Sequence, residues 1–211
     1  MSQLTLFLAR HGESVSNYQN IFIGRSIDPL LTEKGRQQAE SLAKSLKQTP
    51  ITSIFSSTLN RAKQTADIIA DEINVPVTYS EDLIEVGLGL LDGHDISDPA
   101  FLSIYENMVI NWERGYSFVR IPDGESLDDV KERFERFLET NIYNLNFDGP
   151  VLLVGHAILW MSFIWIFCKN RPDKINEGFM KKTHISIVSG KKHALSLVKL
   201  NLNHNEIHAL K

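Results

Sequence analysis

Three places in the chain carry side chains that together could bind and transfer a phosphoryl group. Arg10 and His11 follow one apolar run, and Arg61 and His156 each follow another. Guanidinium groups grip phosphate oxygens in bidentate fashion and stay charged at any working pH. An imidazole can attack phosphorus and carry a covalent intermediate. These residue types therefore predict phosphoryl chemistry, provided that the fold brings them together.

The apolar runs before these side chains have the character of buried parallel strands. Leu4–Ala9, Ile51–Phe55 and Val151–Val154 are short and lack strict polar alternation, as expected for strands covered on both faces. Parallel sheets bind ligands beyond the carboxyl ends of their strands. If the three strands are neighbours, their ends place two histidines and two arginines around one cavity. Gly12 lets the backbone turn sharply and approach a ligand closely.

The intervening segments have helical periodicity. A strand–helix order repeated along the chain predicts an α/β fold: a three-layer α/β/α sandwich with a mostly parallel central sheet and an inserted helical region. Thr32, the serines at 56–57 with Thr58, and the pair Ser126 and Asp129 are expected to cap helices. The predicted elements are helices at 33–47, 59–73, from Pro99 to about 112, 127–143 and 158–168, a third strand at 75–79, and a hairpin turning at 189–192.

Composition restricts the function classes. The 211 residues fit a single domain, 1–211, with a helical insertion at about 90–125. The net charge of −4 gives no reason to expect nucleic-acid or membrane partners, and one cysteine, Cys168, favours a reducing, cytoplasmic location. The apolar stretch 151–168 approaches membrane-span length, but Gly155 and His156 divide it, so a strand followed by a buried helix is expected.

Beyond these features, the sequence resembles the histidine phosphatase superfamily, also called phosphoglycerate mutase-like. The resemblance rests on motifs that span most of the chain in order: LARHGESVSN at 8–17, GRSIDPLLTEKG at 24–35, FSSTLNRAKQTADII at 55–69, LIEVGLGLLDG at 83–93, PDGESL at 122–127 and LLVGH at 152–156. It implies the phosphoglycerate mutase-like fold. It also implies catalysis through a phosphohistidine intermediate, with no cofactor and no metal.

The resemblance assigns roles residue by residue. His11 matches the histidine that substrate phosphorylates, and Glu85 matches the proton donor of the family. Arg10, Arg61 and His156 match the phosphate pocket, and Asn17 matches a residue that also faces the phosphoryl group. Together they imply a metal-independent phosphomonoester hydrolase with His11, Glu85 and His156 in the catalytic set.

The surroundings of this set are less typical of the family. Ala157 stands where family members commonly have glycine, so its methyl group is expected to narrow or shift the pocket. Phe22 and Arg25 follow the first motif and could line the entrance, and His94 could touch substrate. For Arg25 a surface salt bridge, for Phe22 loop packing and for His94 a solvated loop position are the alternatives.

Three functions remain open at this point. A cofactor-dependent phosphoglycerate mutase would need further cations at the mouth, yet Val86–Glu113 contains no Lys or Arg, so the phosphatase branch is favoured. A non-catalytic phospho-ligand binding module is disfavoured because no catalytic group is missing. The expected substrate is a small-molecule phosphomonoester or a phosphoprotein with an uncharged or apolar group beyond the phosphate. The apolar helix at 99–112 could form a substrate lid or a homodimer surface.

Overall fold

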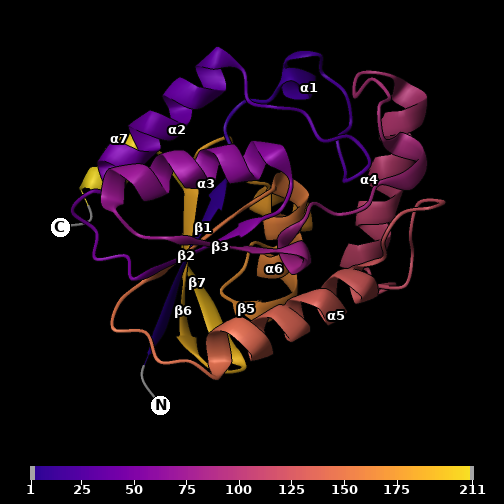
Figure 1. Ribbon diagram of the computed structural model, residues 1–211. Coiled ribbons are helices and arrows are strands. Elements are labelled where there is room, and N and C mark those ends of the chain that lie inside the picture. The colour runs from indigo at the N-terminus through magenta and orange to yellow at the C-terminus, as the bar shows by residue number, and fades with distance from the viewer. Residues whose placement is uncertain (1–2, 210–211) are drawn as a thin grey trace.

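The fold is built on one mixed sheet, seen edge-on among its helices in Figure 1. The computed structural model describes residues 3–209. In this part of the chain the sheet has seven strands in the order β3-β2-β4-β1-β6-β7-β5. They are β1 (Leu4–Arg10), β2 (Ser53–Ser57), β3 (Val77–Ser80), β4 (Val151–Gly155), β5 (Cys168–Lys169), β6 (Ile185–Lys191) and β7 (Ala194–Leu202). Only β6 runs against its neighbours, which confirms the mostly parallel sheet.

Helices cover both faces of this sheet. One face carries α2 (Glu33–Leu46), α3 (Asn60–Ile73) and α7 (His204–His208); the other carries α5 (Leu127–Leu138) and α6 (Ala157–Phe167) (Figure 1). Each face of the sheet has its own hydrophobic core, and alternate residues of β1 point into one or the other. Leu6 and Leu8 pack with α5 and α6, while Phe7 packs with α2 and α3. Both faces of the strand are therefore apolar, which is why its sequence lacks alternation.

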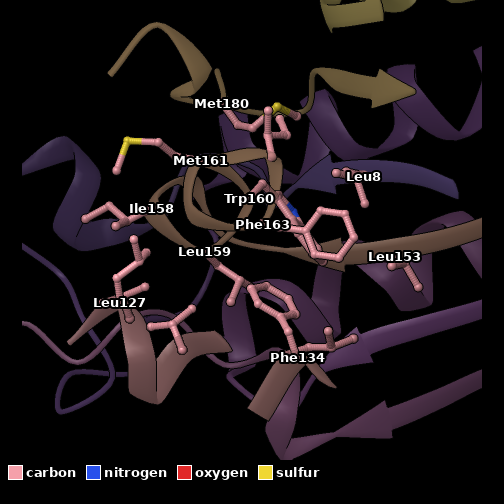
Figure 2. Packing of buried hydrophobic residues seen from close by; sticks show 14 of the residues in the cluster. Leu8, Leu127, Phe134, Leu153, Ile158, Leu159, Trp160, Met161, Phe163 and Met180 are labelled. Carbon is pink, nitrogen blue, oxygen red and sulfur yellow. The ribbon is translucent and has the colours of Figure 1, made fainter. Parts of the chain in front are cut away.

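The apolar stretch 151–168 is the centre of one core. It forms β4, α6 and the start of β5, and Trp160 and Phe163 are completely buried. Figure 2 shows both rings packed with Phe134 of α5; the centroids of Phe134 and Phe163 are 5.0 Å apart. No helix in residues 3–209 is long and apolar enough to cross a membrane.

The helix starts follow from local hydrogen bonds. Thr32 caps α2 by accepting from the amide of Gly35, and Ser126 and Asp129 form the capping box of α5. The cap predicted for α3 was misplaced: its N-cap is Leu59, and Ser57, two residues before it, accepts from the Leu59 amide through Oγ. Asp98 caps α4 (Pro99–Glu113), which begins with proline as predicted.

Shorter segments connect these elements. They are α1 (Val15–Tyr18), three 3-10 turns at Glu81–Leu83, Gly89–Leu91 and Ile175–Gly178, and a π-turn at Glu139–Tyr143 that ends α5 earlier than predicted. The predicted hairpin is β6–β7, but β6 extends to Lys191, so the turn falls at 192–193. The loop after α1 runs beside α4, where Ile21 bridges to Asp95 (Figure 1).

The sheet order brings the chemically interesting strand ends together. β4 lies between β1 and β2 and is parallel to both, with Arg10 opposite Gly155 and Ser56 opposite Val154. The residues that follow β1, β2 and β4 therefore leave the same edge of the sheet. This is the edge at which ligands bind in open parallel sheets.

Candidate active site

A cavity of about 310 Å³ opens at this edge. Its walls come from the loop after β1, the first turn of α3, the segment at 85–88, one face of α4, the start of α6 and the loop before β6. Its lining residues are Arg10, His11, Asn17, Ile21, Phe22, Ile23, Arg61, Glu85, Leu88, Ile96, Leu102, Tyr105, Glu106, Ala157, Ile158, Asn176 and Phe179. A volume of this size with mostly apolar walls and a few convergent polar groups is typical of a small-molecule site.

His11 is held in the tautomer that suits a nucleophile. Its Nδ1 lies 2.7 Å from the carbonyl oxygen of Gly12, which can only accept, so Nδ1 carries the proton. The lone pair is then on Nε2. Burial, followed by the charges of Arg61 and Arg10, holds the pKa of His11 well below its usual range. The imidazole is therefore neutral and can attack an electrophile.

Gly12 fixes the backbone on which His11 sits. A Cβ at this position would overlap the carbonyl oxygen of Gly35, and one at Gly35 would overlap that of Glu13. The Gly12 amide also donates to Thr65 Oγ1 of α3, 3.1 Å away. The two glycines allow the loop after β1 to lie directly on the start of α2, which locks the position of His11.

Two buried arginines supply positive charge. Arg61 donates from Nη2 to the carbonyl of Gly24 at 2.8 Å, and Arg10 donates from Nη1 to the carbonyl of Met180 at 2.8 Å. Burial lowers the pKa of both, that of Arg10 to about 10. A guanidinium nevertheless stays protonated in proteins. The Nε atoms of both arginines are buried and have no partner within the described part of the protein. Arg61 also donates from Nη1 to the carbonyl of Ile27 at 3.2 Å and lies 3.8 Å from Asp28 Oδ1. Each guanidinium is thus anchored by backbone carbonyls and retains N–H donors for an anion.

Asn17 lines the polar end of the cavity, whereas His156 is buried beside His11 and is not itself among the lining residues. The ring of His156 lies 5.2 Å from that of His11, and its Nε2 is 2.8 Å from Ser57 Oγ. Its Nδ1 is a further buried atom without a partner in the described structure. Asn17 Oδ1 accepts from the Ser14 amide, which leaves the amide NH₂ as the end that can donate to a phosphoryl oxygen.

Glu85 is a buried carboxyl group whose environment favours its protonated form. Desolvation raises the pKa of Glu85, and this effect outweighs the amide hydrogen bonds and the charges of Arg61 and Arg10 that lower it. Glu85 Oε1 accepts from the amides of Val86 and Leu159, at 2.9 and 2.8 Å, and Oε2 accepts from the amide of Ile158 at 3.3 Å. A carboxyl group with a raised pKa, fixed in a cavity beside a nucleophile, can serve as a general acid.

A buried ion pair fastens the segment that carries Glu85. Arg133 of α5 binds both carboxylate oxygens of Glu125 at 3.1 Å and donates to the carbonyl of Asp82 at 2.8 Å. Glu125 forms two hydrogen bonds with the backbone of Gly87. Its Oε2 accepts from the Gly87 amide, and its own amide donates to the Gly87 carbonyl, both at 2.8 Å. This Glu125–Arg133 clasp, as we call the ion pair, therefore binds the backbone at Asp82 and at Gly87, on both sides of Glu85.

We predict that Glu125→Gln lowers kcat about tenfold or more while KM changes less, because a shift of about 1 Å in a catalytic group can cost 10²-fold. Steady-state kinetics on a phosphomonoester, with the melting temperature alongside, checks this. Glu139→Gln is the matched control, since it removes the carboxylate of a half-exposed ion pair with Lys192 outside the cavity. A lower melting temperature with unchanged kcat would show that the clasp only stabilises the fold.

Two of the residues considered for the entrance lie elsewhere, and Arg25 takes the salt-bridge alternative. Arg25 does not line the cavity; it forms an ion pair with Glu125 at 3.2 Å and covers Gly87. His94 does not line it either: its ring stacks on Phe101 of α4, with centroids 3.8 Å apart. Phe22 and Ala157 do line the cavity. The backbone of His94 still supports the wall, because its carbonyl accepts from the Phe22 amide at 2.8 Å.

The structure adds wall residues that sequence reasoning did not select. Leu102, Tyr105 and Glu106 come from α4, and Asn176 and Phe179 come from the loop before β6. Tyr105 belongs to the predicted apolar face of α4, so its helical spacing was the available signal. Asn176 and Phe179 lie in an irregular segment that has no periodicity, and no local pattern indicates where it packs.

Comparison with known proteins identifies the family. The model of the histidine phosphatase superfamily (branch 1) matches residues 6–203. Among curated relatives, the probable phosphoglycerate mutase GpmB of Escherichia coli O1:K1 is 36% identical over 159 residues, which cover 74% of this chain and 70% of that protein. The chain belongs to the histidine phosphatase superfamily, as its motifs suggested.

Solved structures agree on the fold. Bacillus stearothermophilus YhfR has a TM-score of 0.77 and 26% identity, covering 95% of this chain and 98% of that one. A mycobacterial glucosyl-3-phosphoglycerate phosphatase has a TM-score of 0.77 at 24% identity, covering 96% and 100%. The similar proteins therefore carry names of phosphatases and of a mutase, and the chain is an enzyme of this superfamily in one of these two groups.

Proposed function

We propose that this protein is a metal-independent phosphomonoester hydrolase that works through a phosphohistidine on His11. The family membership implies a phosphomonoester substrate. The arrangement at the polar end of the cavity supports the rest: a neutral imidazole with its lone pair on Nε2, two anchored guanidinium groups with free donors, and a buried carboxyl group with a raised pKa.

In the first step, His11 Nε2 attacks phosphorus and the bond from phosphorus to the ester oxygen breaks. Arg10, Arg61, Asn17 and His156 hold the equatorial oxygens, and the two guanidinium charges offset the negative charge that a metal ion offsets in other phosphoryl-transfer enzymes. Glu85 transfers its proton to the departing oxygen, so the alcohol leaves neutral. A positioned acid of this kind contributes a factor of about 10²–10⁴.

In the second step, water replaces the alcohol. Glu85, now a carboxylate, accepts a proton from the water as its oxygen attacks phosphorus, and the bond from phosphorus to Nε2 breaks. Inorganic phosphate leaves, His11 is again neutral and Glu85 is again protonated. The same carboxyl group therefore serves as acid and then as base, as microscopic reversibility requires.

The single observation that favours a hydrolase over a mutase is the distribution of positive charge. Among the cavity residues in the described part of the chain, only Arg10 and Arg61 are cationic, and both lie with His11 at the polar end. A phosphoglycerate mutase must also hold the carboxylate of its substrate while it returns the phosphoryl group to a hydroxyl of that substrate, which calls for further cations. The mutase remains the second candidate because GpmB, at 36% identity, carries that name.

The proposal is tested by two assays in excess EDTA. We expect release of phosphate from p-nitrophenyl phosphate and no appreciable interconversion of 2- and 3-phosphoglycerate. Interconversion without net phosphate release would instead assign the mutase reaction. Loss of phosphate release in EDTA, with recovery on adding a divalent cation, would contradict the metal-independent mechanism.

A further inference from the structure

The outer part of the cavity has walls of one chemical kind. Beyond the polar end, the walls are formed mainly by hydrocarbon side chains: Ile21, Phe22, Ile23, Leu88, Ile96, Leu102, Ile158 and Phe179. Phe22 and Tyr105 lie with ring centroids 5.8 Å apart, and Phe179 covers the guanidinium of Arg10 at 5.3 Å. A leaving group that enters this cavity therefore gives up water for contact with aliphatic and aromatic carbon.

Few groups here can replace the hydration of a polar leaving group. The polar side chains of the outer walls are the Tyr105 hydroxyl, the Asn176 amide and the Glu106 carboxylate. The Lys182 ammonium also lowers the pKa of His11, but it pairs with Glu13 at 3.3 Å and does not line the cavity. Among residues 3–209, no cation lines these outer walls, so an anionic substituent on the leaving group would be desolvated without a partner there, which is costly.

The carboxylate of Glu106 also disfavours anionic substrates through electrostatic repulsion. Glu106 lies on α4, one residue after Tyr105, and is exposed while lining the cavity. A carboxylate at the mouth repels a carboxylate or second phosphate on an incoming substrate. Specificity of this kind arises as much from rejecting the wrong substrate as from binding the right one.

From these walls we infer the substrate class: a phosphomonoester of an apolar, carbon-rich alcohol or phenol that carries no second anionic group and few hydroxyl groups. Glu106 is a specificity-determining residue that excludes anionic substrates such as phosphoglycerates. This inference rests on the proposed hydrolase function and narrows it. It disfavours sugar phosphates, whose hydroxyl groups would meet hydrocarbon rather than hydrogen-bonding partners.

Two matched substrate pairs test the inference without bias from the leaving-group pKa. The first pair is p-propylphenyl phosphate and its isostere with a carboxylate in place of the terminal methyl group. The second is cyclohexylmethyl phosphate and glucose 6-phosphate, which share the ring size and the phosphorylated methylene. We expect kcat/KM to be about tenfold or more higher for the apolar member of each pair, because the polar member loses hydration without replacement.

Charge reversal at the mouth tests the role of Glu106. Glu106→Lys is expected to reduce the preference within the first pair by about threefold or more, since it replaces repulsion with attraction. Glu40→Lys is the matched control: it changes the net charge equally on the exposed face of α2, and we expect the preference to stay as in the wild type.

The outcomes separate this inference from the proposed function. If p-nitrophenyl phosphate is not hydrolysed at all, the proposed function fails and the substrate class with it. If it is hydrolysed, but the carboxylate isostere or glucose 6-phosphate reacts as fast as its apolar partner, only the substrate class is overturned. A preference that Glu106→Lys and Glu40→Lys change equally would overturn the role of Glu106.

Discussion

His11→Ala is expected to lower phosphate release by about 10⁴-fold or more, because the substitution removes the atom that accepts the phosphoryl group. The wild type, quenched during turnover, should carry one phosphoryl group that is stable in base and labile in acid, as expected of a phosphohistidine. The variant should carry none. Rates with p-nitrophenyl phosphate and intact-protein mass spectrometry measure both effects.

His193→Ala is the control, because His193 is exposed and lies outside the cavity. It should keep the wild-type rate, and both variants should keep the melting temperature to within a few degrees. A phosphoryl group found on His156, which lies beside His11, would contradict the assignment of the nucleophile. So would a His11→Ala variant with substantial turnover.

Glu85→Gln is expected to have the second-largest effect, and its size should depend on the leaving group. Glutamine keeps the shape and can still accept from the amides of Val86 and Leu159, but it cannot donate the proton that an alkoxide needs. We expect kcat to fall about 10²–10⁴-fold for an alkyl phosphate. The fall should be much smaller for p-nitrophenyl phosphate, whose leaving group departs unprotonated. Equal losses for both substrates would contradict a proton-donor role.

The pH profile of kcat/KM provides a second test of Glu85. The raised pKa of Glu85 keeps the acid form present to higher pH than for an ordinary glutamate, and activity should fall as the pH rises through that pKa. The lowered pKa of His11 keeps the nucleophile neutral at acid pH, and activity should fall only as the pH drops through it. Glu85→Gln should remove the alkaline limb and leave the acid limb. Titration of the substrate phosphate changes the profiles of the wild type and of Glu85→Gln in the same way, so it does not affect the comparison.

The helices and strands of this fold were predicted from local sequence more accurately than the residues at which they begin and end. The strands and helices that contribute to the site were predicted because apolar runs and helical spacing are local signals. The α3 cap was misplaced because Ser56 and Ser57 continue β2, where their backbones pair with Tyr79 and Ser80 of β3. A serine can cap a helix or continue a strand. Here the outcome depends on pairing with β3, which lies more than 20 residues further along the chain.

Arg10, His11, Arg61 and His156 could be selected from local sequence because they follow strands or open helices, whereas Asn17 and Glu85 were selected only through the family resemblance. Arg25 and His94 were considered for the entrance because they are close to the motifs in sequence, but each has a partner elsewhere, Glu125 and Phe101 respectively. The Glu125–Arg133 clasp and the walls from α4 depend on contacts between segments far apart in the chain. Such contacts leave no pattern within any short window.

The central position of β1 also has a bearing on how the chain folds. The first of the described strands, β1, lies between β4, which begins at Val151, and β6, which begins at Ile185. During synthesis β1 has no strand partner until most of the chain has emerged, so the contacts that complete the sheet have large sequence separation and form slowly. Until then, its apolar side chains at positions 6–9 are available to other partners, including chaperones and other nascent chains. The cavity cannot exist before β4 joins β1, so activity depends on a pairing between segments about 140 residues apart.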